Sequence, residues 1–489
     1  MPSIPVRLVS LGCARNDVDS EELAASLEAD GFRLVDEPED AAVVVVNTCG
    51  FVEQAKKDSI DTLLQAADLK ADGVRAVVAV GCLAERYGAE LARELPEADA
   101  VLGFDDYPDI AARLRAILGG ERPAAHAPHD RRLLVPAAPT ERLATVASGS
   151  GGGTARRHAT PGSTTADAAP TGIWVPGHAP ASGPVARRRL DDGPSAPLKI
   201  ASGCDRRCAF CAIPSFRGAY VSRPIPDIVA EARWLVEHGV KEAVLVSENS
   251  SSYGKDLDVA HPFERLLLAL GEVDGLEWIR VSYLQPAELR PSMIDVLTSA
   301  PHVVPYFDLP FQHASAGVLR RMRRFGDAES FLGLLGQIRD RAPAAGIRTN
   351  VIVGFPGETE DDLRELADFL RQARCDAVGV FGYSDEDGTE GATLDGHLDA
   401  EQIDARLEWL ASLVDGLMDD RAEERVGERV RVLVEEVGEE VVARAEHQGP
   451  QTDGTTTISG MTTAARGDIL DATVVGAAGV DLVATVDAA

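Results

Sequence analysis

The sequence is short of positive charge. Its 489 residues include 48 lysines and arginines against 79 aspartates and glutamates, which gives a formal net charge of −31. A protein that binds nucleic acid over a broad surface needs clustered lysine and arginine to neutralise phosphates. The composition therefore argues against a general polyanion-binding protein, although it leaves room for a local basic site.

The sequence also lacks the segments that would place it in a membrane. The start, MPSIPVRLVSLGC, has no charged leader followed by an apolar run of signal-peptide length, and no later stretch approaches about 18 continuous apolar residues. We therefore expect a cytoplasmic protein with no membrane partner. Thiols stay reduced in that compartment, so clustered cysteines indicate metal binding or catalysis rather than disulfides.

Residues 1–120 alternate short apolar runs with amphipathic segments. We predict strands at 6–11, 41–46, 75–80 and 99–104, and helices at 20–30, 53–68, 83–95 and 109–118. This alternation is typical of a parallel sheet that helices cover on both faces.

Residues 121–195 differ abruptly in composition. They are rich in Gly, Ser, Thr, Ala and Pro, hold few large apolar side chains, and carry nine arginines against six acids. Such a segment cannot bury enough apolar surface to offset the entropy of the chain. We predict a low-complexity linker, a solvated tether rather than a binding arm, that proteases cut between residues 145 and 171.

The βα rhythm returns six times between residues 196 and 395. We predict strands at 197–202, 242–247, 277–284, 303–309, 347–355 and 376–384. Six βα units indicate an incomplete TIM-type barrel, whose chemistry lies at the carboxyl ends of its strands. A helix at about 400–425 completes a domain of residues 196–425. Residues 426–489 read as short strands broken by turn residues, which predicts a small all-β barrel.

Three of the seven cysteines crowd into eight positions after the first strand of this barrel. Cys204, Cys208 and Cys211 form a C-x3-C-x2-C motif. Three thiolates in one loop can bind three corners of a cubane cluster and leave the fourth iron open for a substrate or cofactor. Zinc is the weaker alternative, because a structural zinc needs a fourth Cys or His nearby and the flanking residues supply none.

With Phe210 before its last cysteine, this motif resembles that of the radical S-adenosylmethionine (SAM) superfamily. The resemblance implies that the open iron of a [4Fe–4S] cluster chelates the amino and carboxylate groups of SAM. It also implies that an electron from the cluster cleaves SAM to a 5′-deoxyadenosyl radical.

Three more cysteines each follow a predicted strand of the N-terminal domain. Cys13 ends VSLGC, Cys49 ends VVVVNTC and Cys82 ends VVAVGC. The carboxyl ends of parallel strands meet at one edge, so we expect these thiols to converge. Three unrelated core thiols are the alternative, but equivalent strand ends favour a second three-thiolate cluster. Cys375 has no other cysteines grouped with it and is expected to lie in the core.

Together these motifs resemble the methylthiotransferase family over nearly the whole chain. VSLGCARNDVDSE, VVNTCGF, SGCDRRCAFCAIPSFRG, LPFQHASAGVLRRMRR and VGFPGETEDD carry the resemblance. It implies an α/β multidomain protein with a flavodoxin-like N-terminal domain, a partial TIM-type (βα)6 radical SAM barrel and a C-terminal TRAM barrel. It also implies two [4Fe–4S] clusters and two SAM molecules. One SAM methylates a sulfur on the open iron of the N-terminal cluster, and the other supplies the radical.

The branch of the family follows from two motifs. IPSFRG and PFQHAS resemble the branch that modifies the β-carbon of an aspartate in the twelfth small-subunit ribosomal protein. The last 69 residues, 421–489, hold six arginines, no lysine and thirteen acids. Such a barrel repels phosphates and suits a basic protein, so a tRNA adenosine methylthiotransferase is the second hypothesis. A non-enzymatic iron–sulfur carrier is the third. The resemblance further implies an electron donor such as flavodoxin or ferredoxin.

Further cofactor contacts are expected at the carboxyl ends of the barrel strands, with core packing or ordinary turns as the alternative for each. We predict that Phe210 packs on the adenine of SAM and that Glu248 or Asn249 meets its amine. His313 is expected to be structural, because radical abstraction needs no general base. The predicted cofactor-binding residues are Phe210, Glu248, Asn249, Gln312, Gly354 and Tyr383.

Overall fold

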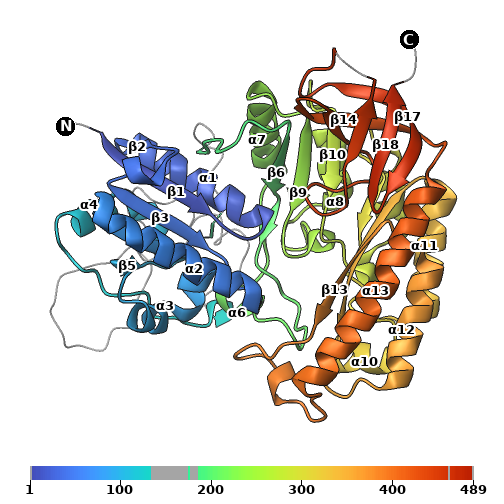
Figure 1. Cartoon of the computed structure of the whole chain (residues 1–489), viewed down its shortest axis with the longest axis horizontal. Helices are drawn as coiled ribbons and strands as arrows, with labels where there is room; N and C mark the ends of the chain where they lie inside the picture. Colours follow the sequence, from blue (N-terminus) through green and yellow to red (C-terminus); the bar gives the residue numbers. More distant parts are fainter. Residues whose placement is uncertain (1–2, 134–174, 177–185, 461–462, 487–489) are drawn as a thin grey trace. The chain divides into compact units, whose positions relative to one another are not determined.

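The computed structural model describes residues 3–133, 175–176, 186–460 and 463–486 (Figure 1). The segment 145–171, for which we predict cleavage by proteases, lies outside these residues. The chain forms two compact units, Met1–Leu190 with Ile213–Tyr220, and Asp191–Ala212 with Val221–Ala489. Within the described ranges, each helix is too short or too polar to cross a membrane.

The first unit is built on a parallel sheet of order β2-β1-β3-β4-β5, the flavodoxin-like arrangement that was predicted. Its strands are β1 (Ile4–Ser10), β2 (Phe32–Leu34), β3 (Val43–Thr48), β4 (Ala76–Gly81) and β5 (Ala100–Val101). Every residue of β3 and β4 is buried. This is expected of central strands covered on both faces, and it explains their unbroken runs of valine and alanine.

In the described part of this unit, four helices cover the sheet: α1 (Ala14–Ala29), α2 (Glu53–Asp68), α3 (Cys82–Glu94) and α4 (Ile110–Leu118). Helix α1 packs with α4, whereas α2 and α3 pack against β3 and β4. The predicted start of the first helix at Ser20 is wrong, since α1 begins six residues earlier. Its first two turns carry Asn16, Asp19 and Ser20, which are polar but fully buried, so the apolar periodicity that marks a helix is missing there.

The described ends of the predicted linker pack on the first unit. The backbone N–H of His126 donates to the carbonyl of Val101 at 3.0 Å. Arg131 pairs with Glu85 at 3.0 Å, and Arg187 pairs with Glu21. These buried ion pairs hold the described ends of the segment against the first unit. The linker boundaries at residues 120 and 195 stay predictions.

The second unit contains two three-stranded parallel sheets of order β10-β9-β6 and β11-β12-β13. A parallel bridge between Ile279 and Val303 joins them, which confirms the partial six-stranded barrel. The strands are β6 (Ser195–Lys199), β9 (Glu242–Val246), β10 (Trp278–Val281), β11 (Tyr306–Asp308), β12 (Gly346–Val353) and β13 (Ala377–Gly382). A short antiparallel pair, β7 (Ala201–Ser202) and β8 (Val221–Ser222), follows β6.

Helices surround this barrel, and three of them begin at capping boxes. Asp327, Thr359 and Asp399 each accept a hydrogen bond from the third residue of the helix that follows. The helices of this unit are α7 (Ile225–Glu237), α8 (Pro262–Leu270), α9 (Pro291–Ser299), α10 (Ala316–Arg321), α11 (Ala328–Arg341), α12 (Glu360–Ala373) and α13 (Ala400–Glu424). Helix α13 lies against β13 and α12 (Figure 1). Cys375 is buried in the core of this domain, as expected.

The last five strands close into a barrel of order β14-β15-β16-β18-β17, as predicted. They are β14 (Arg429–Val437), β15 (Val441–Ala445), β16 (Thr456–Ser459), β17 (Ile469–Ala478) and β18 (Asp481–Val486). Arg444 of β15 and Arg280 of β10 both donate to the buried carboxylate of Glu242 in β9. This charged triad joins the terminal barrel to the strands of the larger one.

Candidate metal centres

The three lone cysteines of the first unit lie at one edge of its sheet. Cys13 follows β1, Cys49 follows β3 and Cys82 opens α3 directly after β4, and these strands are parallel neighbours. Gly12 allows the close approach, because its φ is +97° and a Cβ on it would lie 2.7 Å from the Cβ of Cys49. The structure thus brings the three thiols together, while their role as metal ligands stays a prediction.

Burial dominates the acidity of these thiols. It raises the pKa of Cys49 and raises that of Cys82 to about 12, and the neighbouring cysteines add to both shifts. Cys13 differs, because the charges of Arg15 and Arg217 outweigh burial and lower its pKa. Metal ligation requires thiolates, so filling this site must release protons from Cys49 and Cys82.

Two polar side chains hold the cysteine loops in place. The buried Asn16 amide donates to the carbonyls of Leu11, at 2.9 Å, and Thr48, at 3.1 Å, which ties the turn before Cys13 to the end of β3. The hydroxyl of Ser59 on α2 accepts from the N–H of Cys49 and donates to its carbonyl, both at 3.0 Å. Each loop is therefore fixed by side chains of a packed helix.

This arrangement fits a three-thiolate iron–sulfur cluster. Three thiols from three separate strand ends face a common edge, and each would bind a different iron of a cubane. In the described part of the chain, no set of three or more Cys, His, Asp or Glu side chains is arranged to hold a single metal ion. Ligands of one cubane do not meet at one metal, so the two observations are compatible.

The C-x3-C-x2-C loop of the second unit follows β7 through Gly203, whose φ is +81°. Its cysteines are half-buried. The N–H of Cys211 donates to the carbonyl of Cys208 at 3.1 Å, and the N–H of Ala209 donates to the carbonyl of Met322 at 3.0 Å. Burial raises the pKa of Cys204 to about 12, with smaller contributions from Cys208 and Glu248. Three thiols from one anchored loop at a strand end again fit a cubane with an open iron.

A carboxylate hub ties this loop to the turn after β9. Glu288 accepts from Arg206, which lies between the first two cysteines, at 2.5 Å. It also accepts from Ser252 at 2.8 Å, Lys255 at 2.9 Å and the amide of Asn249 at 3.2 Å. Although burial would raise the pKa of Glu288, Lys255 and Arg206 lower it to about 2. The hub is therefore ionised and holds the cysteine loop electrostatically.

The turn after β9 also carries the two predicted contacts to the SAM amine. Asn249 is buried, and its side-chain oxygen has no hydrogen-bond partner among the described residues. Glu248 lies near enough to Cys204 for its charge to raise the pKa of that thiol. The acceptor on Asn249 and the nearby carboxylate fit an ammonium group beside the cluster, and that contact stays a prediction.

The remaining predicted contacts follow other strands. Gln312 has a left-handed φ of +71°, and Tyr383 donates to Asp385 at 2.9 Å with its ring edge-on to Phe355. A Cβ on Gly354 would lie 2.7 Å from the side chain of Ile403, so packing of α13 already requires this glycine. Phe210 is half-buried and packs against the barrel core. The structure does not test any of these four as cofactor contacts.

His313, which was predicted to be structural, is buried after β11. Its Nδ1 accepts hydrogen bonds from the backbone N–H groups of Ala314 and Ser315, both at 2.9 Å, at the start of α10. Its Nε2 lies 3.4 Å from a carboxylate oxygen of Glu358. These contacts fit a side chain that holds the start of α10, and its structural role stays a prediction.

Each of the three parts of this architecture matches a known protein family. Models of the uncharacterized protein family UPF0004, the radical SAM superfamily and the TRAM domain match residues 5–103, 198–370 and 426–486. A ribosomal protein uS12 methylthiotransferase RimO of Cutibacterium acnes is 63% identical over 491 residues, covering 98% of this chain and 97% of that protein. The chain belongs to the RimO family. A RimO of a Nocardioides species is 61% identical, covering 98% of this chain and 96% of that protein.

A solved structure supports the fold of this RimO family member. The radical SAM methyltransferase TsrM of Kitasatospora setae, solved with cobalamin and a [4Fe–4S] cluster, superposes with a TM-score of 0.52 at 17% identity. The match covers 78% of this chain and 72% of that one. Family and fold together make the chain a radical SAM enzyme that uses SAM and iron–sulfur chemistry.

Sequence reasoning missed the arginines beside the cysteines. Arg217 donates to the sulfur of Cys82 at 3.1 Å, and the buried Arg324 lies 3.9 Å from the sulfur of Cys208. Both stand inside motifs used only to recognise the family, SFRG and LRRMRR. A buried cation that is far in sequence from the acids that balance it has no local signature, so only the fold reveals it.

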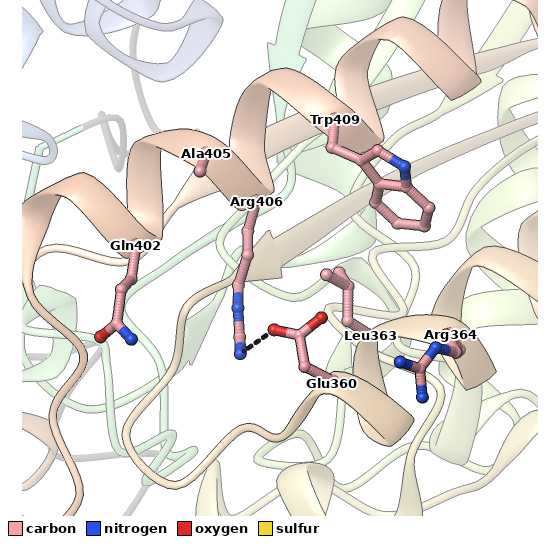
Figure 2. A pocket seen from close by; sticks show the side chains of 7 residues that line it. All are labelled: Glu360, Leu363, Arg364, Gln402, Ala405, Arg406 and Trp409. Carbon is pink, nitrogen blue, oxygen red and sulfur yellow. Dashed lines mark hydrogen bonds and ion pairs between the residues drawn. The ribbon is translucent and has the colours of Figure 1, made fainter.

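A surface hollow of about 450 Å³ lies between α12 and α13, and no cysteine lines it (Figure 2). Arg406 of α13 pairs with the carboxylate of Glu360 on α12 at 2.7 Å. Figure 2 shows this pair, with Trp409 farther along the same helix as Arg406. Its lining residues all belong to these two outer helices. The hollow is therefore not part of either metal centre.

Proposed function

We propose that this chain attaches a methylthio group to the β-carbon of an aspartate in ribosomal protein uS12. One observation carries the proposal: two separate three-cysteine sites occur in a chain that matches proteins named uS12 methylthiotransferases at 56–63% identity over nearly its full length. A single site would serve SAM cleavage alone, whereas insertion of sulfur needs a second place to hold it. Because an enzyme that modifies a ribosomal protein works where ribosomes are, the proposal also places this chain in the cytoplasm.

The proposal assigns two [4Fe–4S] clusters to the chain. When bound, the second-unit cluster supplies the electron that cleaves SAM, and the first-unit cluster supplies a place for sulfur. The residues of the chain shield both sites in part, hold the cysteine loops and keep an arginine next to a cysteine of each site. The proposed ligands are Cys13, Cys49 and Cys82 for the first cluster and Cys204, Cys208 and Cys211 for the second.

Positioning of SAM is assigned to the turn after β9. The side-chain oxygen of Asn249 and the carboxylate of Glu248 would accept from the ammonium group of a bound SAM, and Glu288 joins this turn to the cysteine loop. The electron comes from a small donor protein such as a flavodoxin or a ferredoxin. None of these steps needs a proton-transfer residue, in keeping with the structural role predicted for His313.

Iron content tests the cluster assignment. Changing the three second-unit cysteines to alanine should halve the iron per chain and abolish formation of 5′-deoxyadenosine under dithionite. Changing the three first-unit cysteines should halve the iron but keep that formation. Cys375→Ala is the matched control, because this cysteine is a buried core residue and should change neither. Anaerobic reconstitution that never exceeds about four irons in the parent chain would contradict two clusters, since each cubane holds four.

Mass spectrometry tests the substrate. The enzyme, SAM, a sulfide source and dithionite should add one methylthio group to an aspartate of isolated uS12 or of the small ribosomal subunit. Acidic residues exposed on the terminal barrel support a basic protein partner, especially the acidic turn, defined as Glu436 near the end of β14 with Glu439 and Glu440 between β14 and β15. If digested tRNA gained the group while uS12 did not, the substrate assignment would be wrong although the radical chemistry stood.

A further inference from the structure

Arg217 joins the first cysteine site from a segment that follows the second. It lies six positions after Cys211 in the sequence, at the end of α6 (Ile213–Arg217), and α6 belongs to the first unit. Its Nη2 donates to the sulfur of Cys82 at 3.1 Å and to the side-chain oxygen of Asn16 at 2.7 Å. The peptide that leaves one set of ligands therefore delivers a guanidinium to the other.

The guanidinium is held in one orientation. Its Nη1 donates to the buried carboxylate of Asp19 at 3.0 Å, and its side chain is 3% exposed. The guanidinium carbon lies 5.1 Å from the centre of the Phe104 ring, within cation–π range. A helix of five residues does not fix a long side chain by itself, so these contacts set its position.

The positive charge of Arg217 lies against the cysteine site, because its Nη2 contacts the sulfur of Cys82 inside the fold. Asp19 balances the guanidinium on the side away from Cys82, so the positive end of the ion pair faces the sulfur. Electrostatic effects of this kind are large in a buried site, where the dielectric constant is low.

A three-thiolate cubane is an anion, and reduction by one electron adds a negative charge. An N–H donor on a ligating sulfur stabilises the more negative state, which raises the reduction potential. We propose that Arg217 is a positioning residue for the cluster held by Cys13, Cys49 and Cys82, and that it raises the reduction potential of that cluster. This inference rests on the proposed function, which places a cluster at those cysteines.

The test uses the chain with Cys204, Cys208 and Cys211 changed to alanine, so that only the first-unit cluster is present. In this background, Arg217→Gln is combined with Asp19→Asn, which avoids leaving a buried carboxylate unpaired. The matched control is Arg131→Gln. Arg131 is equally buried, pairs with Glu85 and Asp105, and stands 5.7 Å from the same Phe104 ring.

Two quantities are measured: the iron per chain and the midpoint potential of the cluster. The potential is obtained from an anaerobic dithionite titration, in which the electron paramagnetic resonance signal reports the reduced cluster. The Asp19→Asn, Arg217→Gln variant should show about a tenfold lower ratio of reduced to oxidised cluster at a fixed potential, which is about 59 mV for one electron. Arg217→Lys keeps the positive charge but loses the planar guanidinium with its two terminal donors, so it should shift the potential by less than the double variant does. Arg131→Gln should leave the potential unchanged.

Each outcome decides the matter. Full iron with an unchanged reduction potential in the double variant would overturn the role of Arg217 but leave the proposed first-unit cluster standing. Absence of iron from the background itself would overturn both this role and the proposed first-unit cluster. Loss of iron from the double variant, with retention in Arg217→Lys and Arg131→Gln, supports the positioning role. Equal loss in all three variants would reveal a merely structural arginine and refute it.

Discussion

Glu288→Gln should release the cysteine loop of the second unit. The carboxylate of Glu288 accepts from Arg206 of that loop at 2.5 and 3.0 Å, and its other oxygen accepts from Lys255 and Ser252. Glutamine has nearly the same shape but no charge. The substitution therefore removes the electrostatic part of the attachment and leaves the packing of the turn in place.

The size of the effect follows from the lowered pKa of Glu288. That pKa is about 2 in the folded chain, against about 4.3 for a free glutamate, and the difference corresponds to about 3 kcal/mol. Lys255 is half exposed, so solvent screening reduces the contribution to about 2 kcal/mol. Because the folded pKa is depressed, this stabilisation is complete above pH 4.3 and is lost as the pH falls towards 2. At neutral pH the variant lacks it entirely, which shifts the docked-to-released ratio of the loop about thirtyfold.

The assay uses a chain whose first-unit cysteines are alanine, so that all iron reports on the second-unit loop. Glu288→Gln should retain less iron and form less 5′-deoxyadenosine than its parent. Glu264→Gln is the control, because Glu264 is another partly buried carboxylate of this unit, bonded to Ser292 and Arg290 on α9 and its N-cap. Equal iron and equal product in Glu288→Gln and its parent would refute the electrostatic attachment.

Three further predictions test other parts of the chain. Glu242→Gln leaves the buried Arg280 and Arg444 without their shared carboxylate, so the free energy of unfolding, measured by thermal melting, should fall by about 3–5 kcal/mol. Although burial raises the pKa of Glu242, the two arginines lower it to about 2. The wild type should therefore lose this stabilisation as the pH falls from about 4.3 to 2. Gly12→Ala places a methyl group against Cys49 and should lower first-unit iron, whereas Gly31→Ala, which has the same left-handed backbone but open space around it, should not. Reversing the acidic turn to lysine should slow association with uS12 and weaken its salt dependence, as measured by stopped flow, while 5′-deoxyadenosine formation stays unchanged.

Regular periodicity made much of the fold predictable. The second helix of the first unit was predicted at residues 53–68 and is observed as Glu53–Asp68, because its apolar residues recur at helical spacing. The runs around β3 and β4 were equally plain, since strands buried on both faces are apolar throughout. The three-residue β2 carries too short a pattern to detect, and the polar first turns of α1 conceal a helix whose buried face serves the cysteine site.

The sequence alone determined which thiols form the two candidate sites. Strand ends and motif spacing are local properties, and parallel strands must bring their carboxyl ends to one edge. Only the tertiary structure decided what surrounds those thiols. Arg217 and Glu288 meet their partners across 135 and 82 residues, respectively. Such long-range contacts depend on how helices and turns pack, and a buried charge is stable only where the fold supplies its counter-charge. For that reason the candidate cysteines could be found in the sequence, but the charges beside them could not.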